Sequence, residues 1–174
     1  RFLQPAGFSF DISLWEYLAP LIAGARSVLP PAHALEDMDV LIDVMVDEGI
    51  TATHFVPSLF GALLETDGIK RVSTLKRVFC GGEALSYRLQ QRFLACSTAE
   101  LHHFYGPTEA AINVTAWSCR ARALEGRVPI GGPIRGTHAA IMDKHGRAVP
   151  PGAIGELFLG GCAPARGYLG KPAL

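Results

Sequence analysis

The sequence predicts an α/β protein with a parallel sheet layer covered by helices, followed by an antiparallel β subdomain that is barrel-like. Two observations lead to this class. Up to about residue 120, short apolar runs alternate with segments whose apolar residues recur at helical spacing. From about residue 126, strand patterns are separated by Gly and Pro turns, without a helical pattern. We therefore divide the chain into an α/β subdomain (1–125) and a β subdomain (126–174) that is incomplete at its C-terminus.

The α/β subdomain contains segments with the apolar spacing and the end signals of helices. They cover residues 13–24, 37–49, 57–65 and 84–96. Gly24 and Gly49 close the first two, because glycine readily adopts the left-handed conformation that ends a helix. Acidic residues occupy the first turn of the second helix, and Pro57 opens the third.

Strands are predicted between these helices from short β-branched, aromatic or apolar runs. They cover residues 25–30, 51–56, 75–82 and 100–105. Strands that alternate with helices run parallel, so their carboxyl ends meet at one edge of the sheet, where ligands bind in this class of fold. In the β subdomain, residues 137–161 have the pattern of strands joined by turns.

The composition of the 174-residue chain is that of a globular protein, with 49% hydrophobic and 18% charged residues. Its formal net charge is zero, so we expect no nucleic-acid partner. The four cysteines are widely spaced and form no metal-ligand pattern with the six histidines, which disfavours a disulfide framework and a zinc site. We find no signal peptide and no membrane-spanning run, and we expect a cytoplasmic protein without a membrane partner.

One candidate site lies in the stretch VFCGGEAL, where a strand runs into two glycines before a helix. Gly81 and Gly82 allow the backbone to approach a flat ligand closely. The alternative is an ordinary tight turn, with Glu83 as an acid at the start of the next helix. The stretch alone does not decide between them.

A second candidate is FYGPTEAA, in which Gly106 and Pro107 force a turn at a strand end. Thr108 then presents a hydroxyl and Glu109 a carboxylate, which suits a phosphate with its Mg²⁺, since Mg²⁺ prefers oxygen ligands. The alternative is a threonine that caps a short helix with a glutamate in its first turn.

The third candidate is Asp11, an acid among aromatic and aliphatic neighbours in GFSFDISLW. A carboxylate in so apolar a setting needs a partner. It is either the N-cap of the following helix or a group that meets a cation of the ligand. His54 lies in a strand pattern, and we expect it to be a hydrogen-bonded core histidine.

Taken in order, these stretches resemble a known family. The motifs FSFDISLWE, FVPS, VFCGGEAL, FYGPTEAAINVT, VPIGGPI and GELFLGGCAPARGYLGKP are similar to those of nonribosomal peptide synthetase adenylation domains, which belong to the adenylate-forming superfamily. The resemblance covers essentially the whole chain. It implies an internal fragment of the large N-terminal domain of an adenylate-forming enzyme.

The resemblance implies a reaction in two halves. An amino acid carboxylate attacks the α-phosphate of Mg-ATP, which gives an aminoacyl-adenylate and pyrophosphate. The aminoacyl group then passes to the phosphopantetheine thiol of a peptidyl carrier domain, in an assembly line that also holds a condensation domain. ATP and Mg²⁺ are thus the implied cofactors, and the enzyme acts mostly by positioning and by neutralising charge.

The resemblance also implies residue roles. Tyr105 should lie against the adenine, Thr108 should contact the α-phosphate, and Glu109 should be the Mg²⁺ carboxylate. The implied adenine-side residues are Gly82, Glu83, Ala84 and His103, the last standing where the family usually has an asparagine. Asp11 should pair with the substrate ammonium, and Phe10 should be the aromatic at the entrance of the pocket. The implied pocket wall consists of Asp11, Ile12, Trp15, Ser58, Phe79, Gly81, Phe104, Ile112 and Asn113.

Apart from Asp11, this wall carries no formal charge, so we predict a small or medium, polar, uncharged amino acid such as Ser, Thr or Gln. The family's phosphate loop, ribose-binding Asp and catalytic Lys are not in the sequence, and we expect the chain to be inactive alone. Two alternatives remain: a segment of an acyl- or aryl-CoA ligase, and a degenerate, non-catalytic interaction module.

Overall fold

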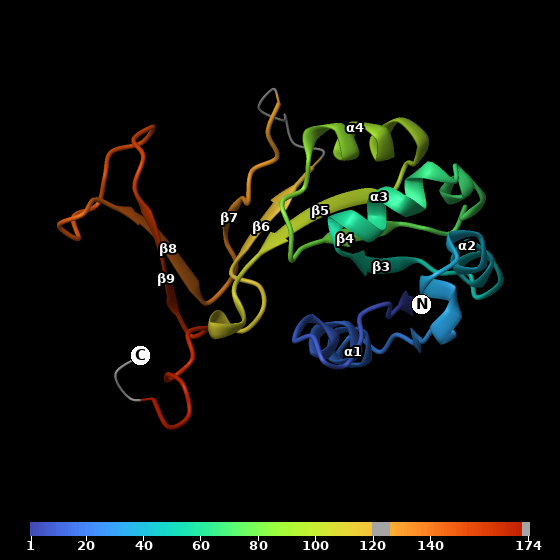
Figure 1. The fold of residues 1–174 in the computed structure, drawn as a ribbon, viewed down its shortest axis with the longest axis horizontal. Helices are drawn as coiled ribbons and strands as arrows, with labels where there is room; N and C mark the ends of the chain where they lie inside the picture. Colours follow the sequence, from blue (N-terminus) through green and yellow to red (C-terminus); the bar gives the residue numbers. More distant parts are fainter. Residues whose placement is uncertain (120–125, 172–174) are drawn as a thin grey trace.

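The computed structural model describes residues 1–119 and 126–171 of the chain. Its main sheet has seven strands in the order β2-β1-β3-β4-β5-β6-β7 (Figure 1). The first five strands in this order run parallel to one another, as the alternating pattern predicts. They are β1 (Phe2–Leu3), β2 (Ser27–Val28), β3 (Ala52–Phe55), β4 (Arg77–Cys80) and β5 (Glu100–Tyr105).

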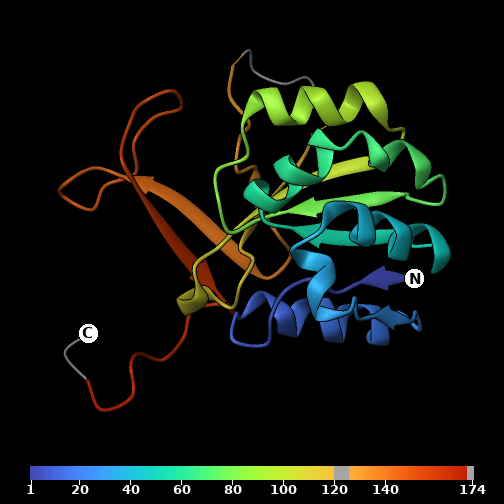
Figure 2. The same cartoon turned by 45° about the vertical axis from the view of Figure 1, so that its right-hand side comes forward.

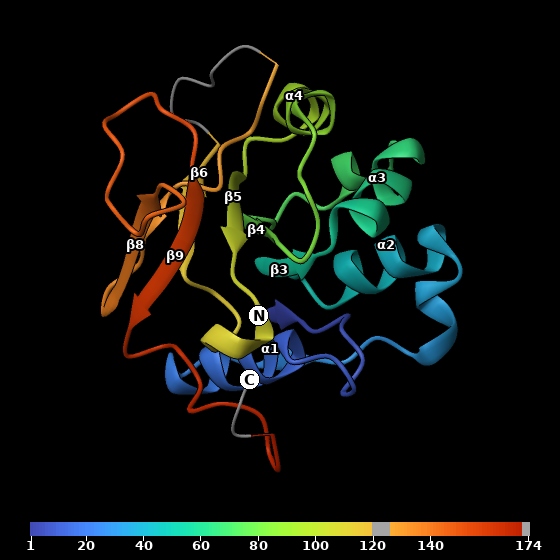
Figure 3. The ribbon, with the colours of Figure 1, turned by 60° about the vertical axis from the view of Figure 1, so that its left-hand side comes forward.

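The four predicted helices are present, and they cover both faces of the sheet. They are α1 (Ile12–Ile22), α2 (Met38–Asp47), α3 (Pro57–Glu65) and α4 (Tyr87–Cys96). Figure 3 shows α2, α3 and α4 on one face and α1 on the other. Three short 3₁₀ turns complete the described helical structure: Ala32–Leu35, Gly68–Arg71 and Thr108–Ala110.

The helix ends follow the local signals. Gly24 and Gly49 have φ angles of 66° and 57°, so both use the left-handed conformation that closes a helix. The Asp37 carboxylate accepts hydrogen bonds from the backbone N–H groups of Asp39 and Val40, which caps α2. Helix α4 begins after Ser86, whose hydroxyl oxygen accepts the backbone N–H of Leu89 at 3.2 Å.

Two strands depart from the expected parallel sheet. Strands β6 (Thr115–Ser118) and β7 (Gly132–Pro133) extend the sheet beyond β5 with antiparallel pairing. The connection between Tyr105 and Thr115 is too short for the crossover of about a dozen residues that a parallel neighbour needs. The chain therefore turns back at Gly106, where a Cβ would overlap the carbonyl of Ile112.

The predicted β unit forms a separate antiparallel pair, β8 (Thr137–Met142) with β9 (Glu156–Gly161). Figure 2 shows this pair to one side of the main sheet. The hydroxyl of Thr137 donates to the Val114 carbonyl at 2.9 Å, which ties the pair to the start of β6. The division of the chain between residues 125 and 126 stays a prediction, since β7 belongs to the main sheet while β8 and β9 do not.

The core lies between the sheet and helices α2 to α4. Phe55 on β3, Phe60 on α3 and Phe93 on α4 are fully buried, and Phe60 packs against the other two at ring distances of 5.9 and 5.2 Å. These ring contacts hold α3 and α4 on the sheet.

Helix α1 packs differently from the other three. Its buried residues include Ser13 and Glu16, while apolar side chains such as Leu14, Tyr17 and Ile22 are exposed. The buried side of α1, which faces the sheet, therefore bears a carboxylate, that of Glu16. Among the described residues, no helix has both the length and the apolar character needed to cross a membrane.

Candidate active site

A cavity of about 490 Å³ opens at the carboxyl ends of the parallel strands. We call it the large cavity. Segments that follow β1, β3, β4 and β5 line it, together with the start of α1. The strand order reverses between β1 and β3, and such a switch point is where open α/β sheets bind their ligands. The topology of the sheet thus determines where the cavity lies.

The large cavity brings together many of the predicted site residues. Those that line it are Phe10, Asp11, Ile12, Gly81, Gly82, Glu83, Ile112 and Asn113. Ile112 has a φ angle of 78°, an unfavourable conformation for a β-branched residue, with a cost of about 1–3 kcal/mol. This turn brings residues 112 and 113 back to the cavity wall beside the end of β5.

Asp11 does not cap the helix that follows it. Its side chain makes no capping hydrogen bond to α1, and instead its carboxylate accepts the hydroxyl of Thr108 at 2.5 Å. Thr108 is not the cap of its 3₁₀ turn, because the N-cap position belongs to Pro107. The structure therefore disfavours both capping alternatives and joins two of the three candidate stretches through one contact.

Glu83 is not an acid at the start of α4 either, since α4 begins at Tyr87. Its carboxylate accepts the backbone N–H of Ser58 at 2.9 Å and the Ser58 hydroxyl at 3.0 Å. Glu83 thereby holds the N-terminus of α3 beside the loop after β4. Ser58 is occupied by this contact and does not line the large cavity, and its role as a wall residue stays a prediction.

Trp15, Phe79 and Phe104 pack edge-to-face or stacked with ring distances between 5.2 and 5.7 Å. None of the three lines the large cavity. Because α1 supplies Trp15 and adjacent strands supply the two phenylalanines, this aromatic cluster fixes α1 against the sheet. Their predicted wall roles remain untested.

A second cavity, about 350 Å³, lies beside the first and shares Gly82, Glu83 and Gly106 with it. We call it the side cavity. Its lining contains predicted adenine-side residues, namely Gly82, Glu83, Ala84, His103 and Tyr105. The size and the glycine-rich wall fit a flat heterocycle.

His103, which replaces the usual asparagine, is buried and engaged on both sides of its ring. Its Nδ1 lies 3.0 Å from the Pro129 carbonyl and its Nε2 lies 3.4 Å from the Glu83 carbonyl. The imidazole therefore joins β5 to the segment before β7 and to the loop after β4. A ligand in the side cavity that hydrogen-bonds to His103 must therefore use a ring nitrogen that already contacts one of these two carbonyls.

The Glu109 carboxylate is exposed and accepts a hydrogen bond from the Tyr168 hydroxyl. This hydrogen bond, with a smaller backbone contribution, lowers the pKa of Glu109 below its ordinary value. The Glu109 carbonyl also accepts the N–H of Ala165 at 2.7 Å. Within the described ranges, no group of three or more His, Cys, Asp or Glu side chains is arranged around a common metal position. A single carboxylate with phosphate oxygens is a donor set that suits Mg²⁺.

Replacing Tyr168 with phenylalanine is expected to raise the pKa of Glu109 toward its ordinary value, because the change removes the largest cause of the lowering. The carboxylate then takes up its proton at a higher pH than in the unchanged protein. An NMR titration of ¹³C-labelled glutamate side chains measures this shift. The matched control is Tyr17→Phe on the outer side of α1. Identical titrations of Glu109 in Y168F and the unchanged protein would contradict the contact.

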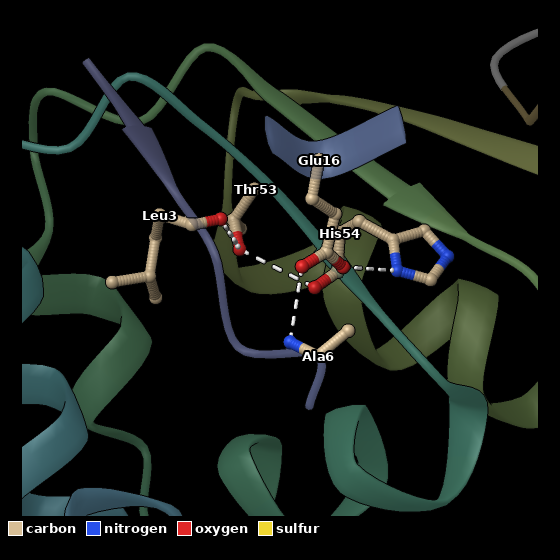
Figure 4. A network of polar contacts seen from close by, with 5 residues as sticks. All are labelled: Leu3, Ala6, Glu16, Thr53 and His54. Carbon is tan, nitrogen blue, oxygen red and sulfur yellow. Dashed lines mark hydrogen bonds and ion pairs between the residues drawn. The ribbon is translucent and has the colours of Figure 1, made fainter. Parts of the chain in front are cut away.

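Two residues that line the large cavity, His54 and Glu16, were not among the predicted site residues. His54 on β3 lines the large cavity and is buried, as expected for a core histidine, but its Nε2 has no hydrogen-bond partner. The expected hydrogen-bonded core histidine is therefore found, with one of its two ring nitrogens left without a partner. Its Nδ1 pairs with Glu16 of α1 at 2.9 Å (Figure 4). One signal was available: Glu16 is the only charged residue between Asp11 and Arg26.

Comparisons with known proteins agree with the topology. The model of the AMP-binding enzyme family matches residues 1–169. The chain is 45% identical to phosphinothricin tripeptide synthetase PhsB of Streptomyces viridochromogenes over 99% of its length, and 40% identical to enterobactin synthase component F of Escherichia coli K12 over 98%. It spans 14% of each of these two curated relatives.

Among solved structures, the nonribosomal peptide synthetase FmoA3 superposes with a TM-score of 0.91 at 28% identity. The match covers 99% of this chain and 19% of that one. The predicted resemblance to nonribosomal peptide synthetase adenylation domains and the predicted fold class are thereby confirmed. The chain belongs to the AMP-binding enzyme family.

Proposed function

We propose that the chain is the substrate-binding part of an amino-acid-activating adenylation domain in a cytoplasmic nonribosomal peptide synthetase. In this function the amino acid carboxylate attacks the α-phosphate of ATP, which forms an aminoacyl-adenylate and releases pyrophosphate. The aminoacyl group then moves to the phosphopantetheine thiol of a carrier domain, next to a condensation domain of the same assembly line.

The observation that carries this proposal is the charge of the large cavity. Three carboxylates line it, those of Asp11, Glu16 and Glu83, and its lining contains no Lys or Arg. Such a cavity favours a cation over an anion. Both carboxylate oxygens of Glu83 are occupied by Ser58, and Glu16 pairs with His54. Asp11 has one described partner, the neutral hydroxyl of Thr108, so its charge is available to the α-ammonium of an amino acid.

Two polar atoms in the wall of the large cavity support a polar substrate side chain. Asn113 Nδ2 and His54 Nε2 are buried and have no hydrogen-bond partner among the described residues. A buried polar atom without a partner destabilises the protein, and a ligand that supplies the missing partner removes that cost. We therefore propose a small or medium, uncharged polar amino acid as the substrate.

We assign the binding of the phosphates to the loop after β5. Thr108 would contact the α-phosphate and Glu109 would hold Mg²⁺, which neutralises phosphate charge when bound. Tyr105, Ala84 and Gly82 in the side cavity would face the adenine. The contact of Thr108 with Asp11 supports this assignment, because the phosphate side and the ammonium side of one substrate would then be adjacent.

ATP–pyrophosphate exchange by the adenylation domain that contains this chain tests the proposal. The panel holds the proteinogenic amino acids together with aryl and fatty acids. We expect exchange with a small or medium polar amino acid, and no exchange by the 174-residue chain alone. Exchange with aryl or fatty acids only would favour the acyl- or aryl-CoA ligase alternative. Absence of exchange with every acid would favour a non-catalytic module.

A further inference from the structure

Glu109 is attached at two points to the segment that follows β9. We call residues 162–171 the C-terminal segment. The Glu109 carboxylate accepts a hydrogen bond from the Tyr168 hydroxyl, and the Glu109 carbonyl accepts the N–H of Ala165 at 2.7 Å. Figure 1 shows the C-terminal segment, in red, beside the 3₁₀ turn Thr108–Ala110. The carboxylate assigned to Mg²⁺ is therefore held by a segment outside the α/β layer.

Backbone contacts hold Tyr168 in place. The N–H of Cys162 donates to the Gly136 carbonyl at 2.9 Å, which ties the start of the C-terminal segment to the start of β8. The N–H of Lys171 donates to the Tyr168 carbonyl at 3.1 Å and closes a turn around Tyr168 itself. The Tyr168 side chain is half exposed, so its hydroxyl can be removed without opening the core.

The two carboxylate oxygens of Glu109 have different surroundings. Oε1 accepts from the Tyr168 hydroxyl, whereas Oε2 has no hydrogen-bond or ion-pair partner among the described residues. A hydroxyl that donates to a carboxylate forms a charge-assisted hydrogen bond, which fixes the carboxylate without cancelling its charge. Carboxylates that ligate metals are commonly oriented by such hydrogen bonds. The arrangement thus leaves one oriented oxygen, with its charge, for a cation.

We propose that Tyr168 is a positioning residue for the divalent cation that accompanies the nucleotide: its hydroxyl fixes one oxygen of Glu109 and leaves the other oxygen for the ion. The inference rests on the proposed function, in which Glu109 holds Mg²⁺, and it adds a residue of the C-terminal segment to that site. A hydroxyl that competed with the ion for the carboxylate would have the opposite effect, because its removal would strengthen metal binding. The sign of the effect therefore decides between the two roles.

Calorimetric titration of the adenylation domain that contains this chain tests the inference without turnover. A non-hydrolysable ATP analogue is titrated at saturating Mg²⁺ and again in EDTA. The ratio of the two dissociation constants, compared between variants, measures how much the protein-bound metal strengthens nucleotide binding. Tyr168→Phe should reduce this ratio by about 10- to 100-fold, the usual effect of removing a residue that orients a metal ligand. Its dissociation constant in EDTA should not change. An unchanged or increased ratio overturns the inference.

Two further variants show whether Tyr168 acts through Glu109. Glu109→Ala removes the carboxylate itself and should reduce the ratio at least as much as Tyr168→Phe does. The double variant Tyr168→Phe/Glu109→Ala should have the same ratio as Glu109→Ala alone, because residues that act through one contact have non-additive effects. A further reduction in the double variant would mean that Tyr168 acts independently of Glu109, and it would overturn the inference.

The same measurements distinguish a failure of the inference from a failure of the proposed function. The matched control is Tyr17→Phe, which removes a hydroxyl from the outer side of α1 and should leave the ratio unaltered. If Glu109→Ala lowers the ratio while Tyr168→Phe does not, the inference alone is wrong. If Glu109→Ala also leaves the ratio unaltered, Glu109 does not hold the metal, and the assignment made in the proposed function is wrong as well.

Discussion

Replacing Asp11 with alanine in the adenylation domain is expected to lower kcat/KM for its amino acid by about 30- to 3,000-fold, with little change in the KM for ATP. The magnitude is that of removing one member of a desolvated charge pair. Asp11 lines the large cavity, and its hydrogen-bond partner is the neutral hydroxyl of Thr108. The α-ammonium of the substrate is the cation it would meet. Pyrophosphate exchange at varied amino acid and ATP concentrations measures both constants.

Two further variants show whether the effect comes from the charge of Asp11. Asp47→Ala makes the same change on the exposed end of α2 and should leave both constants unaltered. Asp11→Asn removes the charge but keeps an oxygen that can accept the Thr108 hydroxyl. If Asp11→Asn retains full activity, Asp11 acts through Thr108 and the ammonium pairing is refuted. If it is as impaired as Asp11→Ala, the charge is responsible.

Replacing Phe60 with alanine is expected to lower the free energy of unfolding by about 3–5 kcal/mol. Phe60 is fully buried and packs against Phe55 and Phe93, which belong to the sheet and to α4. Its removal leaves a void where α3 meets the sheet, and the stiff aromatic neighbours cannot close it. Urea unfolding followed by circular dichroism measures the change.

The control for this variant is Phe158→Ala on β9, whose side chain is 43% exposed. Its cost should be below about 1 kcal/mol, as is usual for surface positions. Similar midpoints for F60A and F158A would contradict the assignment of the core to the layer between the sheet and helices α2 to α4.

The spacing of apolar residues predicted the helices that bury one whole face. All four helices were found at their predicted places because each carries an apolar stripe and a local end signal, such as Gly49 after α2. Strand β1 was missed because two residues are too few to show a pattern. The antiparallel edge was missed because the direction of β6 depends on the length of the turn at Gly106, which carries no hydrophobic pattern of its own.

The candidate site was predictable where residues lie next to each other in a strand-end motif. Gly81 and Gly82 were identified in this way, and both reach the large cavity. Asn113, which also lines it, was implied only by the resemblance to the family. Contacts between distant segments were not predictable. Asp11 meets Thr108 across 97 positions, and Glu16 meets His54 across 38. A propensity for local structure says nothing of such pairs, because the topology of the sheet creates them.

The walls of the large cavity come from separate segments scattered between Pro5 and Asn113. This arrangement has a consequence for grafting between related enzymes. Exchanging only one loop gives a hybrid cavity with walls from two parents, and the Thr108–Asp11 or Glu16–His54 contact can then be mismatched. A transplant that carries residues 5–113 together moves every lining segment of the cavity at once, so the cavity and both contacts are transferred as a block.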